Sequence, residues 1–208
     1  MNWLLLIANA LVFFYELGLS QEDLIRFNNT FALVPARLND LPVHYAISVV
    51  TSMFMHAGWF HILSNLWVLF IFGDNVEDRM GPIPYLIFYL LSGTAAALLQ
   101  TFIFPGSSVP VIGASGAIAG VLGAYIFLFP SARVVTLIPI FLFISLIEVP
   151  ALIFIGFWFV TQLFSGLASI GIESGGVAWW AHIGGFVVGL VISPLFLRRR
   201  PTRQIEFF

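Results

Sequence analysis

Charge is scarce in this chain of 208 residues. Only 9% of the residues are Asp, Glu, Lys or Arg, whereas a soluble domain carries about 25%. Hydrophobic residues make up 60% of the chain, which is more apolar surface than a soluble protein of this length can bury. The composition therefore excludes an ordinary soluble domain and predicts an integral membrane protein.

Cysteine and lysine are both absent. Without cysteine there are no disulfides, no thiolate metal ligands and no cysteine nucleophile. The net charge of −2 leaves no basic surface for nucleic acid, so we expect no nucleic-acid partner. No positively charged segment precedes the first apolar run, and that run is therefore expected to remain as a membrane span rather than to be cleaved as a signal peptide.

Long apolar runs, separated by charged or Pro/Gly-rich breaks, fill most of the sequence. Each membrane-spanning helix needs about 20 mostly apolar residues, so the apolar content suffices for about six spans. We predict an all-α polytopic membrane protein with six transmembrane helices in a single domain over residues 1–208. The predicted spans are residues 3–19, 56–72, 83–104, 114–129, 149–170 and 176–197.

Three segments are predicted to lie outside these spans. Residues 20–55 mix charged and apolar side chains and are expected to form a loop outside the hydrocarbon. The sequence GDNVEDRMGP, residues 73–82, is expected to be a charged turn that ends the second span. Residues 134–147 are apolar, but Pro139 and Glu148 argue against a seventh span, so this segment is expected at the membrane interface.

The arginines predict the orientation, because cytoplasmic loops of membrane proteins carry an excess of positive charge. With six spans, most of them fall on the side that also holds both termini: Arg79, Arg133, Arg198, Arg199, Arg200 and Arg203. Arg26 and Arg37 fall on the opposite side. Both termini are therefore expected to be cytoplasmic.

Polar side chains inside the predicted spans are costly in lipid and usually functional. Four stand out: His56, His61, Asn65 and His182. His61 and Asn65 are four residues apart and share one helix face. Histidines can ligate a metal, but no carboxylate and no H-E-x-x-H motif accompanies His56 and His61, so no metal site is expected.

Small residues surround a serine in the sequence GASGAIAG, residues 113–120. Along one helix face they follow Ser115 at Ala119 and Gly123, and they follow His182 at Gly185 and Gly189. Small residues let two helix backbones approach closely in lipid, so packing of these two spans would bring Ser115 near His182. With six spans, both helices run inward from the outer side, and both side chains lie in the outer half of the membrane.

The chemistry that this set favours is acyl transfer. A serine hydroxyl is a weak nucleophile until a base removes its proton, and His182 is the candidate base for Ser115. Asn65, His61 and the Ser115 backbone N–H are candidate donors to the oxyanion. Gly113 allows close backbone approach beside the nucleophile. No carboxylate lies near His182 in its span, so a Ser-His dyad is favoured over a triad.

Each feature also has a purely structural interpretation. Ser115 in a Gly/Ala run is typical of helix packing, and a lone histidine in a span can make a structural hydrogen bond. The aromatic run FIGFWFVTQLF, residues 154–164, is expected to face lipid or the core, and Trp179 and Trp180 are typical of interface anchors. The coincidence of the whole polar set on one side of the membrane favours an enzyme.

Four motifs occur in order along the chain, and the G-x-S-G pattern among them is specific only in combination with the others. They are HAGWFHILSN at 56–65, GDNVEDRMG at 73–81, GASGAIAG at 113–120 and AHIGGFVVG at 181–189. Together they resemble the rhomboid family of intramembrane serine proteases, and the resemblance covers most of the chain.

This resemblance implies a six-transmembrane-helix rhomboid bundle with a water-filled cavity open to the outside, and no cofactor. It implies that Ser115 is the nucleophile and His182 the general base. His61, Asn65 and the Ser115 backbone N–H would form the oxyanion hole. It also implies that His56 is structural or retains water and that Glu77 and Arg79 form a structural network. Beside these, the residue pattern places Gly113 with the oxyanion and substrate-stabilising positions, and Gly185 and Gly189 with the supporting ones. The fifth span and the residues after it would act as a lateral gate.

One position departs from the family pattern. Some rhomboid proteins carry an aromatic residue four positions after the serine, stacked on the catalytic histidine, and this chain has Ala119 there. His182 must then be oriented by other residues, with Trp179 and Trp180 as candidates. The short segment before the first span is expected of a minimal form of the family.

The resemblance implies an intramembrane serine endopeptidase that cleaves single-span membrane proteins within or near their transmembrane segment. Its partners would be those substrates and the lipid bilayer, and a prokaryotic plasma membrane is the expected location. The alternative is a catalytically silent rhomboid-like factor for membrane binding or trafficking, against which the presence of both Ser115 and His182 argues. A small transporter would also explain intramembrane polar groups, but the chain has no paired charges or repeat that would support it.

Overall fold

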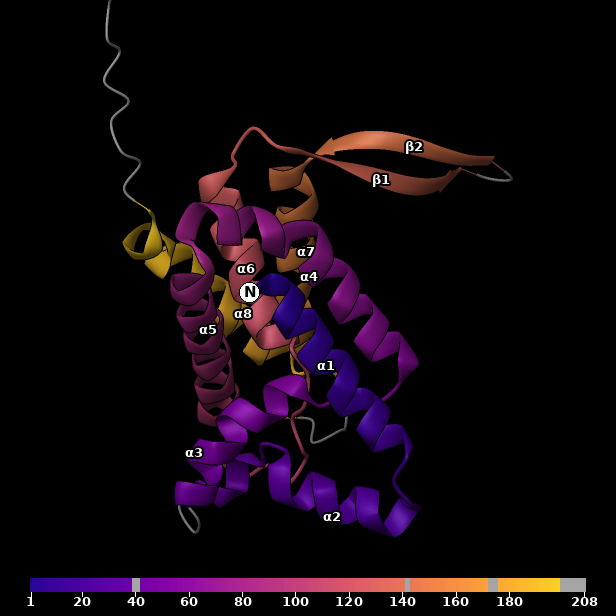
Figure 1. The fold of residues 1–208 in the computed structure, drawn as a ribbon, viewed down its shortest axis with the longest axis vertical. Coiled ribbons are helices and arrows are strands. Elements are labelled where there is room, and N and C mark those ends of the chain that lie inside the picture. Colours follow the sequence, from indigo (N-terminus) through magenta and orange to yellow (C-terminus); the bar gives the residue numbers. More distant parts are fainter. Residues whose placement is uncertain (39–41, 141–142, 172–175, 199–208) are drawn as a thin grey trace, which may run out of the picture.

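The computed structural model describes residues 1–38, 42–140, 143–171 and 176–198, which are mainly helical (Figure 1). The α-helices are α1 (Asn2–Leu17), α2 (Gln21–Phe31), α3 (Pro42–Thr51), α4 (Trp59–Met80), α5 (Pro82–Ile103), α6 (Ser115–Leu128), α7 (Ala151–Ala168) and α8 (Trp179–Ile192). The short 3-10 helices are η1 (Pro35–Arg37), η2 (Ser52–Phe54) and η3 (Ser193–Phe196). The strands β1 (Arg133–Ile140) and β2 (Phe143–Pro150) form an antiparallel hairpin.

Helix α6 lies at the centre of the bundle, with α4, α5, α7 and α8 packed around it and α1 packed against α4 (Figure 1). Every residue from 116 to 125 is buried. The sequence of α6 is apolar on all sides, which is expected of a helix that other helices surround. The element that carries Ser115 is therefore the most enclosed part of the fold.

Helices α6 and α8 touch through their backbones. A Cβ atom at Gly185 would lie 1.9 Å from the carbonyl oxygen of Gly116, and one at Gly189 would lie 2.3 Å from that of Gly120. No side chain fits at either position, so the small residues that follow His182 are required by this contact. The close packing predicted between these two helices is present.

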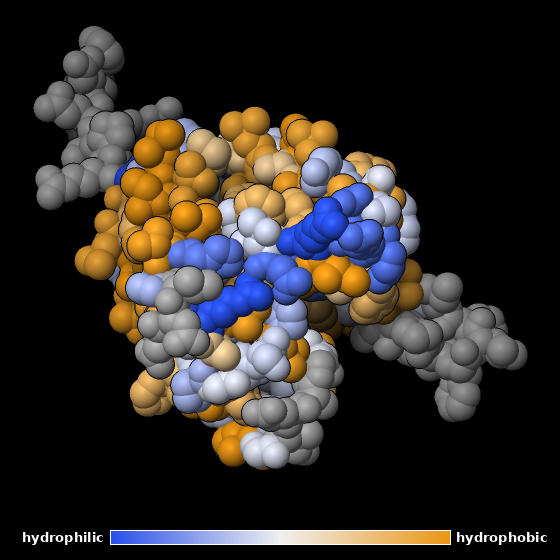
Figure 2. Space-filling model, turned by 90° about the horizontal axis from the view of Figure 1, so that it is seen from below, coloured by the Kyte–Doolittle hydropathy of each residue, from blue (hydrophilic) through white to orange (hydrophobic). Residues whose placement is uncertain are grey.

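The described part of residues 20–55, expected as a loop, contains two α-helices, α2 and α3, and two short 3-10 helices, η1 and η2. Ser20 caps α2 by accepting a hydrogen bond from the Asp23 backbone N–H at 3.2 Å, and the acidic first turn complements the helix dipole. Helices α2 and α3 lie across one end of the bundle (Figure 1). Seen from that end, hydrophilic side chains cross the middle of the surface and hydrophobic ones lie around the margin (Figure 2). The exposed polar residues of α2 include Glu22, Asp23, Arg26 and Asn29.

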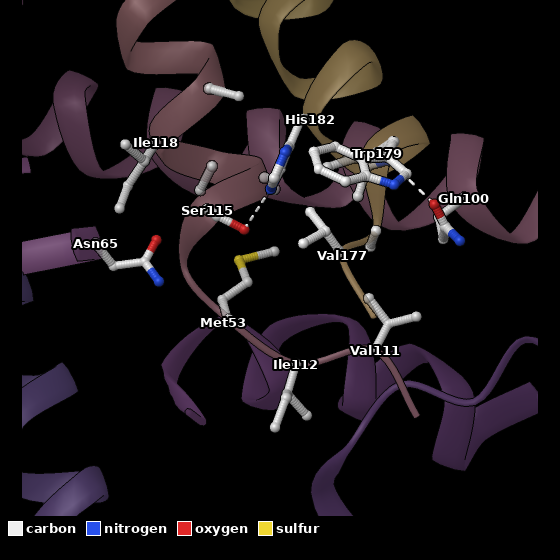
Figure 3. Close-up of a pocket in the computed structure, with 18 of the residues that line it drawn as sticks. Met53, Asn65, Gln100, Val111, Ile112, Ser115, Ile118, Val177, Trp179 and His182 are labelled. Carbon is white, nitrogen blue, oxygen red and sulfur yellow. Dashed lines mark hydrogen bonds between the residues drawn. The ribbon is translucent and has the colours of Figure 1, made fainter. Parts of the chain in front are cut away.

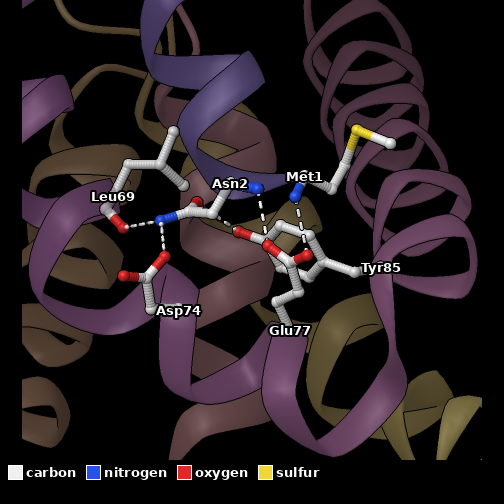
Figure 4. A network of polar contacts seen from close by, with 6 residues as sticks. All are labelled: Met1, Asn2, Leu69, Asp74, Glu77 and Tyr85. Carbon is white, nitrogen blue, oxygen red and sulfur yellow. Dashed lines mark hydrogen bonds and ion pairs between the residues drawn. The ribbon is translucent and has the colours of Figure 1, made fainter.

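Helix α4 continues through the charged sequence that was expected to be a turn, and it ends at Met80. Its carboxylates have partners that the local sequence does not show: Asp74 accepts a hydrogen bond from the Asn2 side chain at 2.9 Å, and Glu77 accepts one from the Asn2 backbone N–H at 2.6 Å (Figure 4). The chain turns at Gly81, whose φ of 91° is a left-handed conformation that glycine adopts readily. The polar residues therefore belong to the helix.

The β hairpin is a departure from the all-α prediction. It joins α6 to α7 and projects sideways from the end of the bundle opposite α2 and α3 (Figure 1). Its register pairs Arg133 with Pro150 and Leu137 with Leu146. The segment is rich in Val and Ile, which favour strands, and its prolines oppose a helix. The location of residues 134–147 at the membrane interface stays a prediction.

Among the described residues, three helical segments are long and apolar enough to cross a membrane: α5, α7 and the stretch from α8 through η3. A fourth exists if α3–η2 and α4, which are bent by 81° at a short break, count as one span. Helices α1 and α6 are apolar but shorter, with 16 and 14 residues. Three or four spans are supported in this way, and six spans stay a prediction.

Three of the arginines that predict the orientation lie at one end of the bundle. The Arg198 backbone N–H donates to the Arg79 carbonyl at 3.0 Å. The Arg79 guanidinium lies 5.4 Å from the centre of the Phe129 ring, which is close to the start of the hairpin at Arg133. Arg199, Arg200 and Arg203 lie outside the described residues.

Candidate active site

Ser115 is the first residue of α6, directly after a sharp turn. Gly113 has a φ of 125°, and its N–H donates to the Ser52 carbonyl at 2.9 Å. A Cβ at this position would lie 2.6 Å from His61 Nε2, so only glycine lets the histidine ring come this close. The turn therefore fixes Ser115 beside His61.

A cavity of about 910 Å³ opens in front of Ser115, and several polar side chains face it (Figure 3). It is lined by Ser115, His182, His61, Asn65 and Gln100, together with apolar residues of α6, α7 and the segment before α4. The Ser115 hydroxyl is partly exposed, whereas the His182 side chain is 8% exposed. The Ser115 Oγ and His182 Nε2 atoms are 2.7 Å apart, which is a hydrogen-bond distance.

The second ring nitrogen of His182 contacts a residue that the sequence did not single out. His182 Nδ1 lies 2.8 Å from Oε1 of Gln162, a side chain of α7 that is 4% exposed. The signal was present, because Gln162 is an amide inside the aromatic run that was expected to face lipid or the core. Gln100 was missed in the same way, and its Oε1 accepts the Ala181 backbone N–H at 3.2 Å.

Aromatic rings flank His182 in the absence of an aromatic at Ala119, which is fully buried in α6. The Trp179 ring lies edge-on at 6.3 Å, so this candidate from the sequence is next to the histidine. Trp158 of α7 lies at 5.8 Å with a tilt of 36°, and the sequence did not identify it. The Trp180 Nε1–H donates instead to the Gly166 carbonyl of α7 at 3.0 Å.

The candidate oxyanion donors line the cavity on the side of α4. Asn65 Nδ2 donates to the His61 carbonyl at 2.8 Å, a contact along its own helix. His61 Nδ1 is 3.4 Å from the Ala57 backbone N–H, which can only donate. A neutral His61 ring therefore carries its hydrogen on Nε2, the atom that faces Gly113.

His56 lies behind His61 rather than beside Ser115. Its side chain is 4% exposed, and its ring packs edge-on against the His61 ring at 5.0 Å. The His56 backbone N–H donates to Glu16 Oε2 at 3.1 Å, and Nδ1 is 3.2 Å from the Phe54 carbonyl. These contacts hold the start of the α4 segment against α1.

Glu77 and Arg79 lie at the opposite end of the bundle from the cavity. Glu77 accepts hydrogen bonds from the Met1 amino group and the Asn2 backbone N–H, both at 2.6 Å (Figure 4). Arg79 packs against Phe129. The two residues thus contact different elements and are remote from Ser115. In the described part of the chain, no group of three or more His, Cys, Asp or Glu side chains is close enough to hold a metal ion.

Comparisons with known proteins agree on one family. A model of the rhomboid domain matches residues 44–199. The chain is 44% identical to "Rhomboid-like protein 11, chloroplastic" of Arabidopsis thaliana over 34% of this chain and 25% of that protein. It is 29% identical to "Rhomboid protein 1, mitochondrial" of Saccharomyces cerevisiae over 70% of this chain and 40% of that protein.

A third relative is named as inactive. The chain is 31% identical to "Inactive RHOMBOID-like protein 8" of Arabidopsis thaliana over 39% of this chain and 22% of that protein. The matches cover between 22% and 40% of the length of these three relatives. Since two of them are named as organellar proteins, they give no support to the expectation of a prokaryotic plasma membrane.

Proposed function

The chain belongs to the rhomboid family, and we propose that it is an intramembrane serine endopeptidase. The observation that carries this proposal is the 2.7 Å contact between Ser115 Oγ and His182 Nε2 at the wall of a large cavity. A serine hydroxyl in contact with a neutral imidazole is the arrangement that activates a weak nucleophile. This contact also joins two helices whose backbones cannot shift easily.

In the first step, the Ser115 oxygen attacks the scissile carbonyl while its proton moves to His182 Nε2. The imidazolium then gives this proton to the departing amine, and an acyl-enzyme forms. Water attacks the acyl-enzyme with His182 again as the base, which releases the second product. The reaction needs no group other than those of the chain and water.

The developing oxyanion needs donors that are already in place. The Ser115 backbone N–H, the His61 Nε2–H and the Asn65 amide are the groups that fulfil this role in the proposal. The His61 ring lies against Gly113, two residues before the nucleophile, where a Cβ atom would come within 2.6 Å of Nε2. Asn65 Nδ2 donates one hydrogen to the His61 carbonyl, and its second N–H is the donor that the proposal assigns to the oxyanion.

The substrates in this proposal are single-span membrane proteins, cleaved within or near their transmembrane segment. The bundle would cross the bilayer six times, with α1, α4, α5, α6, α7 and α8 as the spans and the arginine-rich end in the cytoplasm. Ser115 and His182 are both near the helix ends on the other side, where α2 and α3 lie. Unwound substrate would therefore meet the cavity from the outer half of the membrane.

A catalytically silent rhomboid-like factor is the second candidate, because one of the relatives is named inactive. A silent member has no need for a serine hydroxyl at hydrogen-bond distance from a histidine beside a cavity. The contact between Ser115 and His182 thus favours the protease.

A fluorophosphonate probe and a cleavage assay test the proposal together. We expect the probe to label the wild type in detergent or liposomes, and we expect Ser115→Ala and His182→Ala to lose labelling. Cleavage of single-span reporters in proteoliposomes should fall by roughly 10³-fold or more in both variants. Ser165→Ala, a serine variant on α7, serves as the matched control and should be labelled as wild type. Equal labelling of wild type and Ser115→Ala would exclude Ser115 as the nucleophile.

A further inference from the structure

An amide side chain of α7 reaches the face of His182 that points away from the nucleophile. Gln162 is buried at 4% exposure, and its Oε1 lies 2.8 Å from His182 Nδ1. Nearly all its neighbours along α7 are apolar, and an amide in such a segment is costly unless its hydrogen bonds are made. This contact with His182 is therefore the natural reason for an amide at position 162.

The direction of the Gln162 amide is fixed by its other contacts. Gln162 Nε2 lies 3.2 Å from the Trp158 carbonyl and 3.0 Å from Thr161 Oγ1. A carbonyl oxygen can only accept, so the NH₂ group must point toward Trp158. Thr161 donates its own hydrogen to the same carbonyl at 2.6 Å, which leaves its oxygen free to accept from Gln162. The amide oxygen is thereby directed at His182.

This direction determines which nitrogen of His182 carries the hydrogen. Gln162 Oε1 can only accept, so His182 Nδ1 must be the donor in the 2.8 Å contact. A neutral imidazole has one N–H, and Nε2 is then left with a lone pair toward the Ser115 hydroxyl 2.7 Å away. The hydrogen bonds therefore all donate in one direction, from the Ser115 hydroxyl to His182 Nε2 and from His182 Nδ1 to the Gln162 amide oxygen.

We propose that Gln162 is a positioning residue that holds His182 in the Nδ1–H tautomer required of the base. The proposal rests on the proteolytic function above and adds to it a third polar residue, on α7, behind the Ser-His pair. It accounts for the missing aromatic at Ala119, because a hydrogen bond to Nδ1 orients the ring without a stacking partner from α6.

The proton transfers balance without any change at Gln162. When the Ser115 oxygen bonds to the scissile carbon, its proton moves to Nε2, and the imidazolium carries hydrogens on both nitrogens. The Nδ1–H stays bonded to the amide oxygen while Nε2 gives its proton to the leaving amine. Gln162 is a neutral acceptor throughout, so it orients the base but contributes less to imidazolium stability than a carboxylate would.

The first test replaces the acceptor. Gln162→Leu removes the hydrogen bond and keeps a similar apolar volume, so His182 is free to adopt the other tautomer or to rotate. For reporter cleavage in proteoliposomes we expect kcat to fall by roughly 10- to 100-fold with little change in KM, because a buried hydrogen bond to the base is lost. Ser165→Ala, which removes a polar group three residues further along α7, should keep the wild-type kcat.

The second variant keeps an acceptor and adds charge. Gln162→Glu should recover much of the activity that Gln162→Leu loses, because its carboxylate can accept from Nδ1. A negative charge next to the imidazolium stabilises the protonated ring relative to the neutral one. Since the base must be neutral, the acidic limb of the kcat/KM profile should move to higher pH than in the wild type. A residue that merely fills space would produce neither the rescue nor this shift.

A spectroscopic measurement gives the decisive result independently of turnover. The ring nitrogens are observed in protein labelled with ¹⁵N-histidine, and the His182 signals are assigned by their loss in His182→Asn. In Ser115→Ala these signals should report a hydrogen on Nδ1. When Gln162→Leu is added to Ser115→Ala, the preference for Nδ1 should be lost. An unchanged tautomer in the double variant would overturn the proposal. Loss of activity in Gln162→Leu with unchanged tautomer and a lower melting temperature would overturn it as well, by assigning Gln162 a structural role. Failure of the protease assay alone would reject the proposed function and leave this measurement interpretable.

Discussion

The helix that carries His182, α8, and the helix that packs against it, α7, are held in place by different kinds of contact. Helix α8 meets α6 backbone to backbone, with the Gly185 α-carbon against the Gly116 carbonyl. Helix α7 meets α8 through side chains. The closest aromatic pair between them is Phe159 and Phe186, whose rings stack with their centres 4.2 Å apart. In the spanning stretch that contains α8, 39% of the residues are buried, whereas in that of α7 the share is 22%.

This difference separates two tasks in the candidate site. The contact of α6 with α8 fixes the distance between the backbones that carry Ser115 and His182, and no rotamer change can alter it. The orientation of the His182 ring depends instead on Gln162 and Trp158, which belong to the less buried helix. The placement of the two groups is therefore rigid, and their alignment depends on how α7 is seated.

The largest effect is expected from a side chain at the backbone contact. Gly185→Val would place a Cβ 1.9 Å from the Gly116 carbonyl oxygen, where neither backbone can yield. We expect a loss of at least about 3 kcal/mol of stability, the upper end for overpacking, together with loss of probe labelling. Thermal unfolding in detergent and labelling measure the two effects. The control is Gly156→Val on α7, which has nothing within 4 Å and should remain folded and active. If both variants behave alike, the contrast between the two helices is wrong.

A smaller effect is expected when α7 is loosened. Phe159→Ala removes the ring that stacks on Phe186 but leaves Gln162 and His182 unchanged. Activity should fall by about tenfold while the folded state persists, because truncating a partly buried Phe costs less than the roughly 3–5 kcal/mol of a core position. Reporter cleavage and melting temperature are the measurements. Phe157→Ala, at a side chain that is 72% exposed, is the matched control and should match the wild type. Equal losses of activity in the two variants would mean that the packing of α7 against α8 does not determine the orientation of the His182 ring.

The smallest effect is expected from one hydrogen bond between α8 and α7. Trp180→Phe keeps the ring but removes the Nε1–H that donates to the Gly166 carbonyl at 3.0 Å. We expect about 1 kcal/mol less stability and a loss of activity of no more than about threefold. Trp67→Phe, at a ring that is 66% exposed on α4, controls for the exchange of Trp for Phe. A loss of activity of tenfold or more in Trp180→Phe would contradict this ranking, because it would show that a single hydrogen bond between α8 and α7 controls the alignment of His182.

The sequence predicted the helices whose signals are local. Helix α5 begins and ends within one residue of the predicted third span, because Pro82 starts it and a Pro/Gly-rich segment follows it. The end of α4 was misplaced by eight residues, since Asp74 and Glu77 are stabilised by Asn2, which lies more than 70 positions away in the chain. No local pattern contains that information.

The candidate site was predictable to a similar extent. The spacing of small residues indicated that Ser115 and His182 would lie close together, and the structure brings them to 2.7 Å. Gln162 and Trp158 were missed because their surroundings are apolar on all sides, so periodicity does not show which face of α7 points inward. The amide itself was the available signal, since a glutamine in such a run needs a partner.

The backbone contact between Gly116 and Gly185 also limits how this protein can vary. Where the backbones of two helices touch directly, no side chain can be enlarged or shortened to change their separation. Single substitutions therefore cannot adjust the distance between the nucleophile and the base in small steps. Helix α7 offers the opposite situation, because large side chains there can be replaced one at a time. The evolutionary freedom to tune reaction rate in this chain is therefore concentrated on the helix that holds neither member of the pair.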